Sequence, residues 1–569
     1  MAGGYHIELG TKSSGRGSLD RPPDLVLPGA AIWSQEPLIV AGPRTVIIGR
    51  VFRRGKPSMP VVTLGQEEAD HLMSDRAHAL LGQYWGGYVI VHVDADDVVR
   101  VFRDPSGLLP CYFRRRAEDI VLAGSVTDLA APGADAVDFV ELAFTLAGGD
   151  LRGRQTCLAD IEELIAGECL AFDHGKASTK AWWSPWDHTG APVMELEDAV
   201  AALRETVTDC VRAWAGAFPA ILVGVSGGLD SSIVTAAAAQ SDASLICLNL
   251  VSSDFDGDER RYARALSDHL GIELVEADRE LADIDVTRSA APHHPWPVAP
   301  LYKQTNEEIH RRLLSARPFD AFFTGNGGDG IFFGTRSTIA LIDRLLAQGP
   351  RPSLASTVQD ISVLTGADAG TVLKYGWARY RRNRGRHAAG YNFSGLNRQL
   401  ARRIRKRGAT HPWLTAPDDV LPGKTVHAAY LMRAQKGVEL YDRATMPPHI
   451  APLMSQPIVE LCFAIPSWFW IAGGLNRAVA RSAFEPLLPA VVSARTQKGG
   501  PGDFHLSIYR RHRDTLHARL REGVLAASGI LDLSLLDAPD DPTWRGTERI
   551  DRILALSAAE NWARYWSGG

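Results

Sequence analysis

The chain has 569 residues, of which 45% are hydrophobic and 22% are charged, and its formal net charge is −5 at pH 7. This length exceeds what one hydrophobic core supports, so we expect several domains. The composition excludes a largely disordered chain, and the slightly acidic balance argues against nucleic acid as the main partner.

The sequence lacks the features of membrane and secreted proteins. No uninterrupted apolar run approaches the roughly 18 residues of a spanning helix, and the first residues, MAGGYHIELG, contain no basic segment followed by an apolar one. The cysteines are scattered and form no CxxC pair; they are Cys111, Cys157, Cys169, Cys210, Cys247 and Cys462. We therefore expect a protein of the reducing cytoplasm with no membrane partner.

The first 190 or so residues are predicted to form antiparallel β-structure. Short segments rich in β-branched and aromatic residues are separated by Gly, Pro and Asp, which is the pattern of strands joined by turns. The predicted strands are 45–52, 88–94, 97–102, 119–124 and 169–172. Residues 184–197 contain two prolines and a glycine, and we interpret them as a linker to the next domain.

After this linker the pattern changes to strands that alternate with helices. The predicted elements are a helix at 196–217, a strand at 220–225, a helix at 231–240, a strand at 244–251, a helix at 259–271 and a strand at 272–277. This alternation indicates βαβ units and a parallel sheet. From about residue 335 the pattern is mostly helical. The predicted fold class is α/β, with an antiparallel first domain and a largely helical C-terminal part.

A strongly basic stretch lies within this helical part. Between Lys374 and Arg407 there are twelve Lys and Arg residues and no Asp or Glu. One interpretation is a solvated surface loop. The other is a basic lid or docking patch for an anionic substrate or partner, and the sequence leaves both open.

The segment AILVGVSGGLDSS, residues 220–232, has the composition of an anion-binding loop. A predicted strand ends at Val225, and Gly227 and Gly228 then allow the backbone to approach a ligand closely. The hydroxyl groups of the nearby serines add donors beside the N-terminus of the next helix. Asp230 would repel a phosphate unless it holds a divalent metal that also binds the phosphate. The GxxxxGK[ST] pattern is absent, which argues against transfer of a γ-phosphoryl group.

A second glycine-rich segment, DAFFTGNGGDGIFFG at 320–334, repeats this arrangement of strand, glycines and carboxylate. Its carboxylate is Asp329. Because the carboxyl ends of neighbouring parallel strands meet at one edge of a sheet, we expect Asp230 and Asp329 to share one metal ion.

These two segments resemble those that flank ATP in the asparagine synthetase superfamily, whose members cleave ATP between the α- and β-phosphates. The resemblance implies ATP and Mg²⁺ as cofactors, with the metal held by Asp230 and Asp329. It implies that pyrophosphate is held by Ser226, Gly227, Gly228 and Ser231. It also implies a nucleotide pocket lined by Val225, Leu248, Thr324 and Gly325.

The first domain is similar to class II glutamine amidotransferases. Residues 85–113 contain the R-D-x-x-G-x-x-P turn of that family, and 156–172 resemble the end of its domain. The family's nucleophile is an N-terminal cysteine, but position 2 is Ala and no cysteine precedes Cys111. We therefore expect no hydrolysis of glutamine. The predicted domains are a degenerate amidotransferase-like domain at 1–190 and an ATP-dependent synthetase domain at 191–569.

Two C-terminal tracts, 452–466 and 472–500, resemble the lasso-peptide macrolactam synthetases. This resemblance implies that a side-chain carboxylate (Asp or Glu) of a core peptide is adenylated and then joined to the peptide's N-terminal amine, with release of AMP and pyrophosphate. Lys498, three residues after Arg495, occupies the position of the family's catalytic lysine. The implied partners are the precursor peptide, a leader peptidase and a leader-binding protein.

Other interpretations stay open. β-Lactam synthetases also lack the N-terminal cysteine, but their catalytic tyrosine and the corresponding glutamate of asparagine synthetases are replaced here by Asn326. A non-catalytic scaffold is a third possibility. His293 and His294 have no partners at metal-ligand spacing, so we interpret them as loop residues.

Overall fold

The structure is a computed structural model that describes residues 4–10, 21–149, 151, 153–190, 194–251, 258–297, 300–382, 390–439, 441–496, 502–538 and 544–569. In the part of the chain so described, no helix has both the length and the apolar character needed to cross a membrane.

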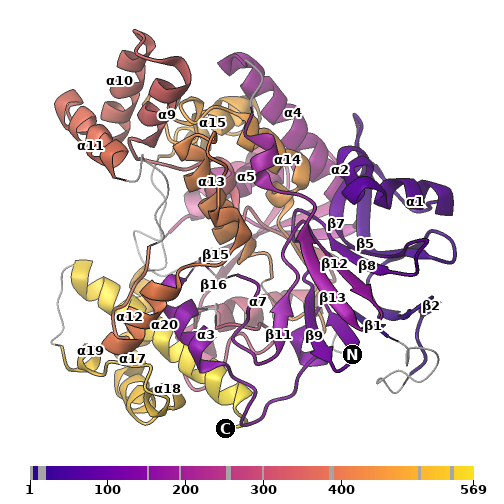
Figure 1. Ribbon diagram of the computed structural model, residues 1–569. Helices are drawn as coiled ribbons and strands as arrows, with labels where there is room; N and C mark the ends of the chain where they lie inside the picture. The colour runs from indigo at the N-terminus through magenta and orange to yellow at the C-terminus, as the bar shows by residue number, and fades with distance from the viewer. Residues whose placement is uncertain are drawn as a thin grey trace.

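Two antiparallel sheets form the N-terminal part of the molecule, residues 5–181, which we call its first half although it is the shorter of the two parts (right side of Figure 1). One has the order β11-β9-β10-β1-β3-β2, with strands β1 Tyr5–Leu9, β2 Leu25–Leu27, β3 Ala30–Ser34, β9 Tyr112–Arg116, β10 Asp119–Ala123 and β11 Ile161–Glu163. The other has the order β13-β12-β8-β7-β5-β4, with β6 paired to β5. Its strands are β4 Leu38–Val40, β5 Thr45–Arg53, β6 Met59–Pro60, β7 Tyr84–Val93, β8 Val99–Arg103, β12 Glu168–Asp173 and β13 Lys176–Ala181.

The central strands β5 and β7 of the second sheet are buried on both faces, which explains their nearly continuous apolar sequence. Successive side chains of a strand point to opposite faces. In β5, Val46 and Ile48 pack into the core between the two sheets, whereas Ile47 packs against helices α1 (Gln66–Met73) and α2 (His78–Gln83). All five predicted strands of this half are confirmed.

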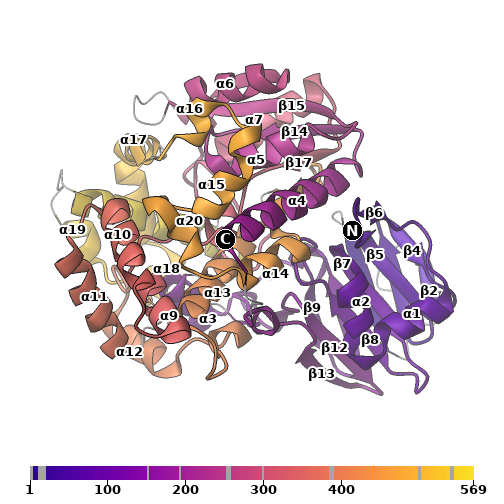
Figure 2. The ribbon, with the colours of Figure 1, turned by 90° about the horizontal axis from the view of Figure 1, so that it is seen from above.

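A parallel sheet with the order β16-β15-β14-β17-β18 is the centre of the second half. Its strands are β14 Ala220–Gly224, β15 Ser244–Val251, β16 Glu273–Asp278, β17 Ala321–Phe323 and β18 His449–Ile450. The first helices of this half are α4 Leu196–Ala215, α5 Leu229–Ala238, α6 Arg260–Leu270 and α7 Lys303–Ala316. Seen from above in Figure 2, α4 and α5 lie beside β14 and β17. The predicted βαβ pattern and fold class are confirmed.

The remaining helices form three groups. Helices α9 (Ile339–Gln348), α10 (Ser353–Thr365) and α11 (Ala369–Arg381) project together at the upper left of Figure 1. A second group packs against one another or against α4, α5 and α6, and consists of α8 Gly328–Ile331, α13 Pro422–Gln435, α14 Gln456–Ala464, α15 Ala478–Phe484 and α16 Ala490–Ser493. The C-terminal group is α12 Arg398–Arg407, α17 Gly502–Arg521, α18 Val524–Ala527, α19 Ser534–Asp537 and α20 Trp544–Trp566.

This C-terminal group packs around a helix of the first half. Helix α3 (Phe139–Gly148) contributes Leu142 and Phe144 to a core that also contains Ile508 of α17 and Trp562 of α20. The predicted boundary after residue 190 stays a prediction, since the adjoining residues 191–193 lie outside the described residues.

The basic stretch is largely helical where it is described. Its first part lies in α11 and its last part in α12, while residues 383–389 fall outside the described ranges. Arg407 forms an ion pair with Glu141 and lies 4.9 Å above the ring of Phe144, so it fastens α12 to α3. Of the two interpretations left open, a loop is wrong for these two segments, which are helices, although most basic side chains of α12 are exposed.

The two halves of the molecule share a continuous core and a buried polar contact. Trp214 of α4 packs edge-on against Phe52 and Trp85 of the second antiparallel sheet, at centroid distances of 5.1 and 6.4 Å. Nearby, the Glu460 carboxylate accepts hydrogen bonds from Arg54 (2.7 Å) and from the indole of Trp183 (3.2 Å).

We predict that Glu460→Gln destabilises this interface. The amide replaces one acceptor oxygen with a donor, which leaves a partly buried donor of Arg54 or Trp183 unpaired, at a cost of about 2 kcal/mol. Urea unfolding measures the change. The matched control is Glu205→Gln, which breaks an ion pair with Lys56 across the same interface. The side chain of Lys56 is 71% exposed and that of Glu205 is 53% exposed. The control should have little effect, and equal effects of both variants would contradict the prediction.

Candidate active site

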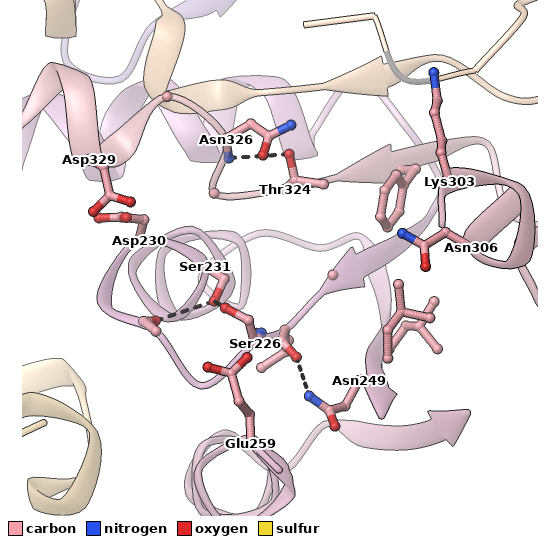
Figure 3. Close-up of a pocket in the computed structure, with 18 of the residues that line it drawn as sticks. Ser226, Asp230, Ser231, Asn249, Glu259, Lys303, Asn306, Thr324, Asn326 and Asp329 are labelled. Atoms are coloured by element: carbon pink, nitrogen blue, oxygen red, sulfur yellow. Dashed lines mark hydrogen bonds between the residues drawn. The ribbon is translucent and has the colours of Figure 1, made fainter. Parts of the chain in front are cut away.

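A cavity of about 790 Å³ opens at the carboxyl ends of the parallel strands. It is lined by residues that follow β14 and β17 and by side chains of β15, α7 and α13 (Figure 3). Ligands of open parallel sheets bind in this position, where strand-end loops converge. The predicted residues in its wall are Val225, Ser226, Gly228, Asp230, Ser231, Leu248, Thr324, Gly325 and Asp329.

The loop after β14 is shaped by its glycines and serines. Gly227 has φ +59°, and a Cβ there would lie 2.3 Å from the Cβ of Tyr262, so only glycine fits. Gly227 lies close to Tyr262 and does not itself line the cavity. The Ser226 amide donates to the Ser231 hydroxyl at 3.3 Å. Because α5 begins at Leu229, its positive N-terminal end faces the cavity, where an anion would be stabilised.

The loop after β17 lies directly against the first turn of α5. A Cβ on Gly325 would lie 2.4 Å from the backbone nitrogen of Ser231, and one on Gly328 would lie 2.4 Å from Cγ of Asp230. Neither position has room for a side chain. The glycines of this segment are therefore needed to let the two loops touch, which brings Asp329 to Asp230.

Thr324 is fixed at the end of β17 by a buried histidine. Its hydroxyl lies 2.7 Å from Nε2 of His449, and Nδ1 of His449 lies 2.8 Å from the carbonyl oxygen of Val438. Burial lowers the pKa of His449 to about 3, so the ring is neutral. Nδ1 then carries the proton and donates to Val438, and Nε2 accepts from Thr324.

The carboxylates of Asp230 and Asp329 face each other (Figure 3). Nη1 of Arg477 lies 2.8 and 2.7 Å from the two oxygens of Asp230 and 2.5 Å from Oδ1 of Asp329. The pair therefore already holds one cationic group between its oxygens. Hard carboxylate oxygens are the ligands that Mg²⁺ prefers, with phosphate and water completing its shell. The donor set fits the predicted metal, although no cluster of three or more potential ligands occurs among the described residues.

Sequence reasoning missed Arg477 as a site residue. It lies 247 positions from Asp230, at the start of α15, and no spacing connects the two. Its backbone is left-handed, with φ 58° and ψ 40°, which is uncommon for a residue with a Cβ.

A second arginine, Arg495, holds the C-terminal segment beside the first loop. Its guanidinium bonds to Glu259 at 2.8 Å, donates to the Ser226 carbonyl at 3.3 Å and lies 4.1 Å above the ring of Tyr262. The predicted catalytic Lys498 lies in 497–501, outside the described residues, and its role stays a prediction.

Strand β15 closes one side of the cavity. The Leu248 carbonyl accepts from the Val225 amide at 2.8 Å, and the side-chain amide of Asn249 donates to the Val225 carbonyl at 2.7 Å. Asn249 is 1% exposed. These bonds fix the backbone where β14 continues into the first loop. They place the predicted pocket residues Val225 and Leu248 in the cavity wall.

The end of the cavity away from the carboxylates carries a buried lysine that the sequence did not reveal (Figure 3). Lys303 is 6% exposed, and its ammonium lies 5.7 Å above the ring of Tyr441. Among the described residues its side chain has no hydrogen bond or ion pair. Burial lowers its pKa to about 8. Next to it, Asn306 accepts from Arg279 at 2.9 Å through its side-chain oxygen. A ligand group with spare acceptors would find donors here.

His293 and His294 lie in a loop, as predicted, but are buried. Their rings lie 4.2 Å apart, and burial lowers the pKa of His293 well below its usual range. The neutral, buried ring of His293, packed beside that of His294, fits a packing role.

The second half of the chain matches a known protein family. The sequence model described as asparagine synthase matches residues 202–563, which is more than half of the chain. The chain belongs to the asparagine synthase family. Membership in this family supports ATP-dependent, amide-forming ligase activity in general. No curated protein matches the chain.

Two solved structures are similar over about half of the chain. One, described as the allosteric regulatory enzyme of purine biosynthesis, has 12% identity and a TM-score of 0.20, and the match covers 49% of this chain and 75% of that one. The other is the glutamine phosphoribosylpyrophosphate amidotransferase from B. subtilis complexed with ADP and GMP, with 11% identity, a TM-score of 0.19, and coverage of 48% and 60%.

We predict that Gly325→Ala weakens binding of a non-hydrolysable ATP analogue by roughly tenfold or more, because overpacking a rigid contact costs about 1–3 kcal/mol. The added methyl would push the second loop away from α5. Isothermal titration measures the affinity. Gly437→Ala is the matched control beside the same loop, since a Cβ there would have only ordinary contacts, at 3.6 Å. Unchanged binding by Gly325→Ala would show that the loops do not need this contact.

We predict that Lys303→Met stabilises the protein at pH 7. The lowered pKa of Lys303 means that holding its charge in the folded state is unfavourable, by about 3 kcal/mol. Between pH 8 and the higher pKa of an unfolded chain, the folded state loses the proton first, so stability from this group rises with pH. The advantage of the variant should therefore shrink by about half or more from pH 7 to pH 9.5. Thermal unfolding at both pH values measures it, and a constant difference would contradict the assignment.

Proposed function

We propose that the protein is an ATP-dependent lasso-peptide cyclase of the asparagine synthase family. One observation supports it above all others: the loop from Ser226 to Ser231 and the carboxylate of Asp329 converge on a single cavity at the strand ends. The C-terminal tracts 452–466 and 472–500 narrow the substrate to a peptide through their resemblance to macrolactam synthetases.

The proposed reaction has two steps in this cavity. A side-chain carboxylate of the core peptide attacks the α-phosphorus of ATP, which gives an acyl-adenylate and pyrophosphate. The N-terminal amine of the same peptide then attacks the acyl carbon and displaces AMP, closing an isopeptide macrolactam. Adenylation is needed because a carboxylate is a poor electrophile at neutral pH. The cavity would hold the two ends of the peptide together, and this proximity supplies much of the rate.

The residues of the first loop would hold the pyrophosphate as it leaves. The amide groups around Gly228 and the hydroxyls of Ser226 and Ser231 are donors at the positive end of α5, where negative charge develops. Mg²⁺ held by Asp230 and Asp329 would supply further charge neutralisation at the phosphates. Lys498, in the same tract as Arg495, would stabilise charge on the α-phosphate and on the tetrahedral carbon.

The position of the catalytic tyrosine of β-lactam synthetases supports the peptide cyclase over that alternative. Here it is Asn326, whose side-chain amide donates to the Gly437 carbonyl at 3.0 Å. An amide cannot take up a proton at neutral pH. The base that deprotonates the attacking amine must therefore be supplied elsewhere.

A structural role for the first half, without glutaminase activity, is part of the proposal. Ala2 lies outside the described residues. All the cysteines of the chain are buried, and burial raises the pKa of Cys111 to about 11, so it is not a thiolate at neutral pH. The turn at Arg103 serves packing instead: its guanidinium donates to the carbonyls of Leu109 and Leu164 at 2.9 and 2.7 Å. Ammonia from glutamine is not needed, since the peptide brings its own amine.

The proposed partners follow from this chemistry. A free N-terminal amine on the core peptide requires removal of any leader segment before cyclisation. We therefore propose a leader peptidase and a leader-binding protein as partners, acting in the cytoplasm on the same precursor.

ATP–pyrophosphate exchange tests the function. The probe is the leaderless core of a precursor peptide encoded beside the gene, compared with the same peptide carrying Asn or Gln at its acidic position. The acidic peptide should drive exchange and form a product lighter by one water, and the amide peptide should do neither. An N-acetylated acidic peptide should drive exchange without cyclising. Exchange driven by a free amino acid would favour a small-molecule ligase, and no exchange with any substrate would favour a scaffold.

We predict that Lys498→Ala lowers kcat for cyclisation much more than it raises KM for ATP, by ~100-fold or more in kcat. A lysine ammonium acts as a point charge, so Lys498→Arg should recover little. Ser226→Ala, in the phosphate loop, should mainly raise KM for ATP. Steady-state cyclisation at varied ATP measures all three. Near-normal kcat for Lys498→Ala would remove this lysine from the mechanism.

A further inference from the structure

The contact between Arg477 and the two carboxylates is a competitor for metal binding. All three of its short distances, 2.5 to 2.8 Å, involve the same nitrogen, Nη1. The guanidinium therefore occupies the lone pairs that Asp230 and Asp329 would turn toward one shared cation. Its side chain and that of Asp230 are 11% and 9% exposed, so solvent screens this contact weakly.

The conformation of Arg477 has an uncommon backbone geometry and leaves buried polar atoms without hydrogen bonds. The residue is held in the left-handed region of backbone conformation. Its Nε and the side-chain oxygen of the preceding Asn476 are buried and lack hydrogen-bond partners among the described residues. Buried polar groups without partners are uncommon in folded proteins and often mark functional sites.

We propose that Arg477 is a placeholder cation, which keeps Asp230 and Asp329 together in the nucleotide-free protein and excludes a divalent ion until nucleotide binds. This inference rests on the proposed function only in that it takes the pair as the metal ligands of an ATP site. It assigns a role to a residue that sequence reasoning had not placed in the site.

The physical argument is one of charge. Without a cation, two carboxylates that share one bridging group would repel each other, and the largely buried carboxylate of Asp230 would lose its ion pair with Arg477. Arg477 removes both costs. A divalent ion that entered alone would have to displace the guanidinium, and no anion is there to receive it. When a triphosphate arrives, its oxygens offer the guanidinium the planar, two-point contact that it prefers.

The consequence is that binding of metal and of nucleotide become mutually dependent. Free Mg²⁺ should bind the empty site poorly, and it should bind well only as part of a metal–nucleotide complex. A purely structural bridge, in which Arg477 never releases the pair, makes a different prediction, because the wild type would then bind divalent ions at these carboxylates no better with nucleotide than without it.

The test uses Mn²⁺ as the probe, with no nucleotide present. Electron paramagnetic resonance of free Mn²⁺ gives the dissociation constant for the full-length protein and its variants. Wild-type protein should bind weakly, with a constant of ~1 mM or higher. Arg477→Gln should bind at least about tenfold more tightly, because the competing charge is gone. Asp329→Asn added to this variant should abolish the gain.

Arg495→Gln is the matched control. It removes a positive charge beside the same phosphate loop, where its guanidinium contacts Glu259 and the Ser226 carbonyl. It should bind Mn²⁺ like the wild type. An equal gain in both variants would mean that general electrostatics, not displacement of Arg477, controls the metal, and that result would overturn the inference.

If Arg477→Gln does not fold, Arg477→Lys and the wild type provide the same test. Arg477→Lys retains the charge but offers fewer contacts, so a smaller gain of roughly threefold is expected. Tight binding of Mn²⁺ by the wild type alone, at ~10 µM or below, would overturn the inference without any variant. None of these measurements depends on peptide, so a failed cyclisation assay and a failed placeholder are distinguishable.

Discussion

The site depends on one close contact between two backbones. Strands β14 and β17 are parallel neighbours, with Val223 opposite Phe323, so the loops that follow them emerge side by side. These loops can touch only because Gly325 and Gly328 have no side chains to hold them apart. Their approach places a buried carboxylate, Asp230, against a more exposed one, and it aims the N-terminus of α5 into the same cavity. Anion-binding donors and metal-binding acceptors are thereby combined within one wall.

This contact also brings two negative charges together, and arginines from the C-terminal part of the chain compensate them. The carboxylate pair is balanced by Arg477 from α15, and the adjoining loop is braced by Arg495, which comes from the segment just before the predicted catalytic lysine. At the opposite end of the cavity, Lys303 keeps an unfavourable buried charge. Groups held at a cost to stability are typical of ligand sites, since the ligand supplies the missing partner. One end of the cavity thus holds a carboxylate pair neutralised by Arg477, and the other end holds the buried ammonium of Lys303.

The first half of the molecule is joined to the part that carries this site through extensive packing. Its antiparallel sheet meets α4 at Trp214, and its R-D-x-x-G-x-x-P turn reaches the helical part, where Arg443 donates to the Leu108 carbonyl at 2.9 Å. Within the turn, burial raises the pKa of Asp104 to about 6, while the amides of Tyr88 and Ser106 donate to its carboxylate. Such a network rigidifies the junction.

Local sequence determined the central strands β5, β7 and β8, the strands β14 to β16 and both glycine-rich loops, because alternation of apolar residues, glycine placement and helix starts depend on neighbours only a few positions apart. It therefore predicted that Asp230 and Asp329 would meet. It did not reveal Arg477 or Lys303, and it did not show that α3 of the first half packs with α20 near the other end of the chain. Those features arise from contacts across hundreds of residues, as between Arg477 and Asp230, which lie 247 positions apart. No periodicity or motif records such a separation, so only the packed tertiary structure could decide which arginine would neutralise the pair.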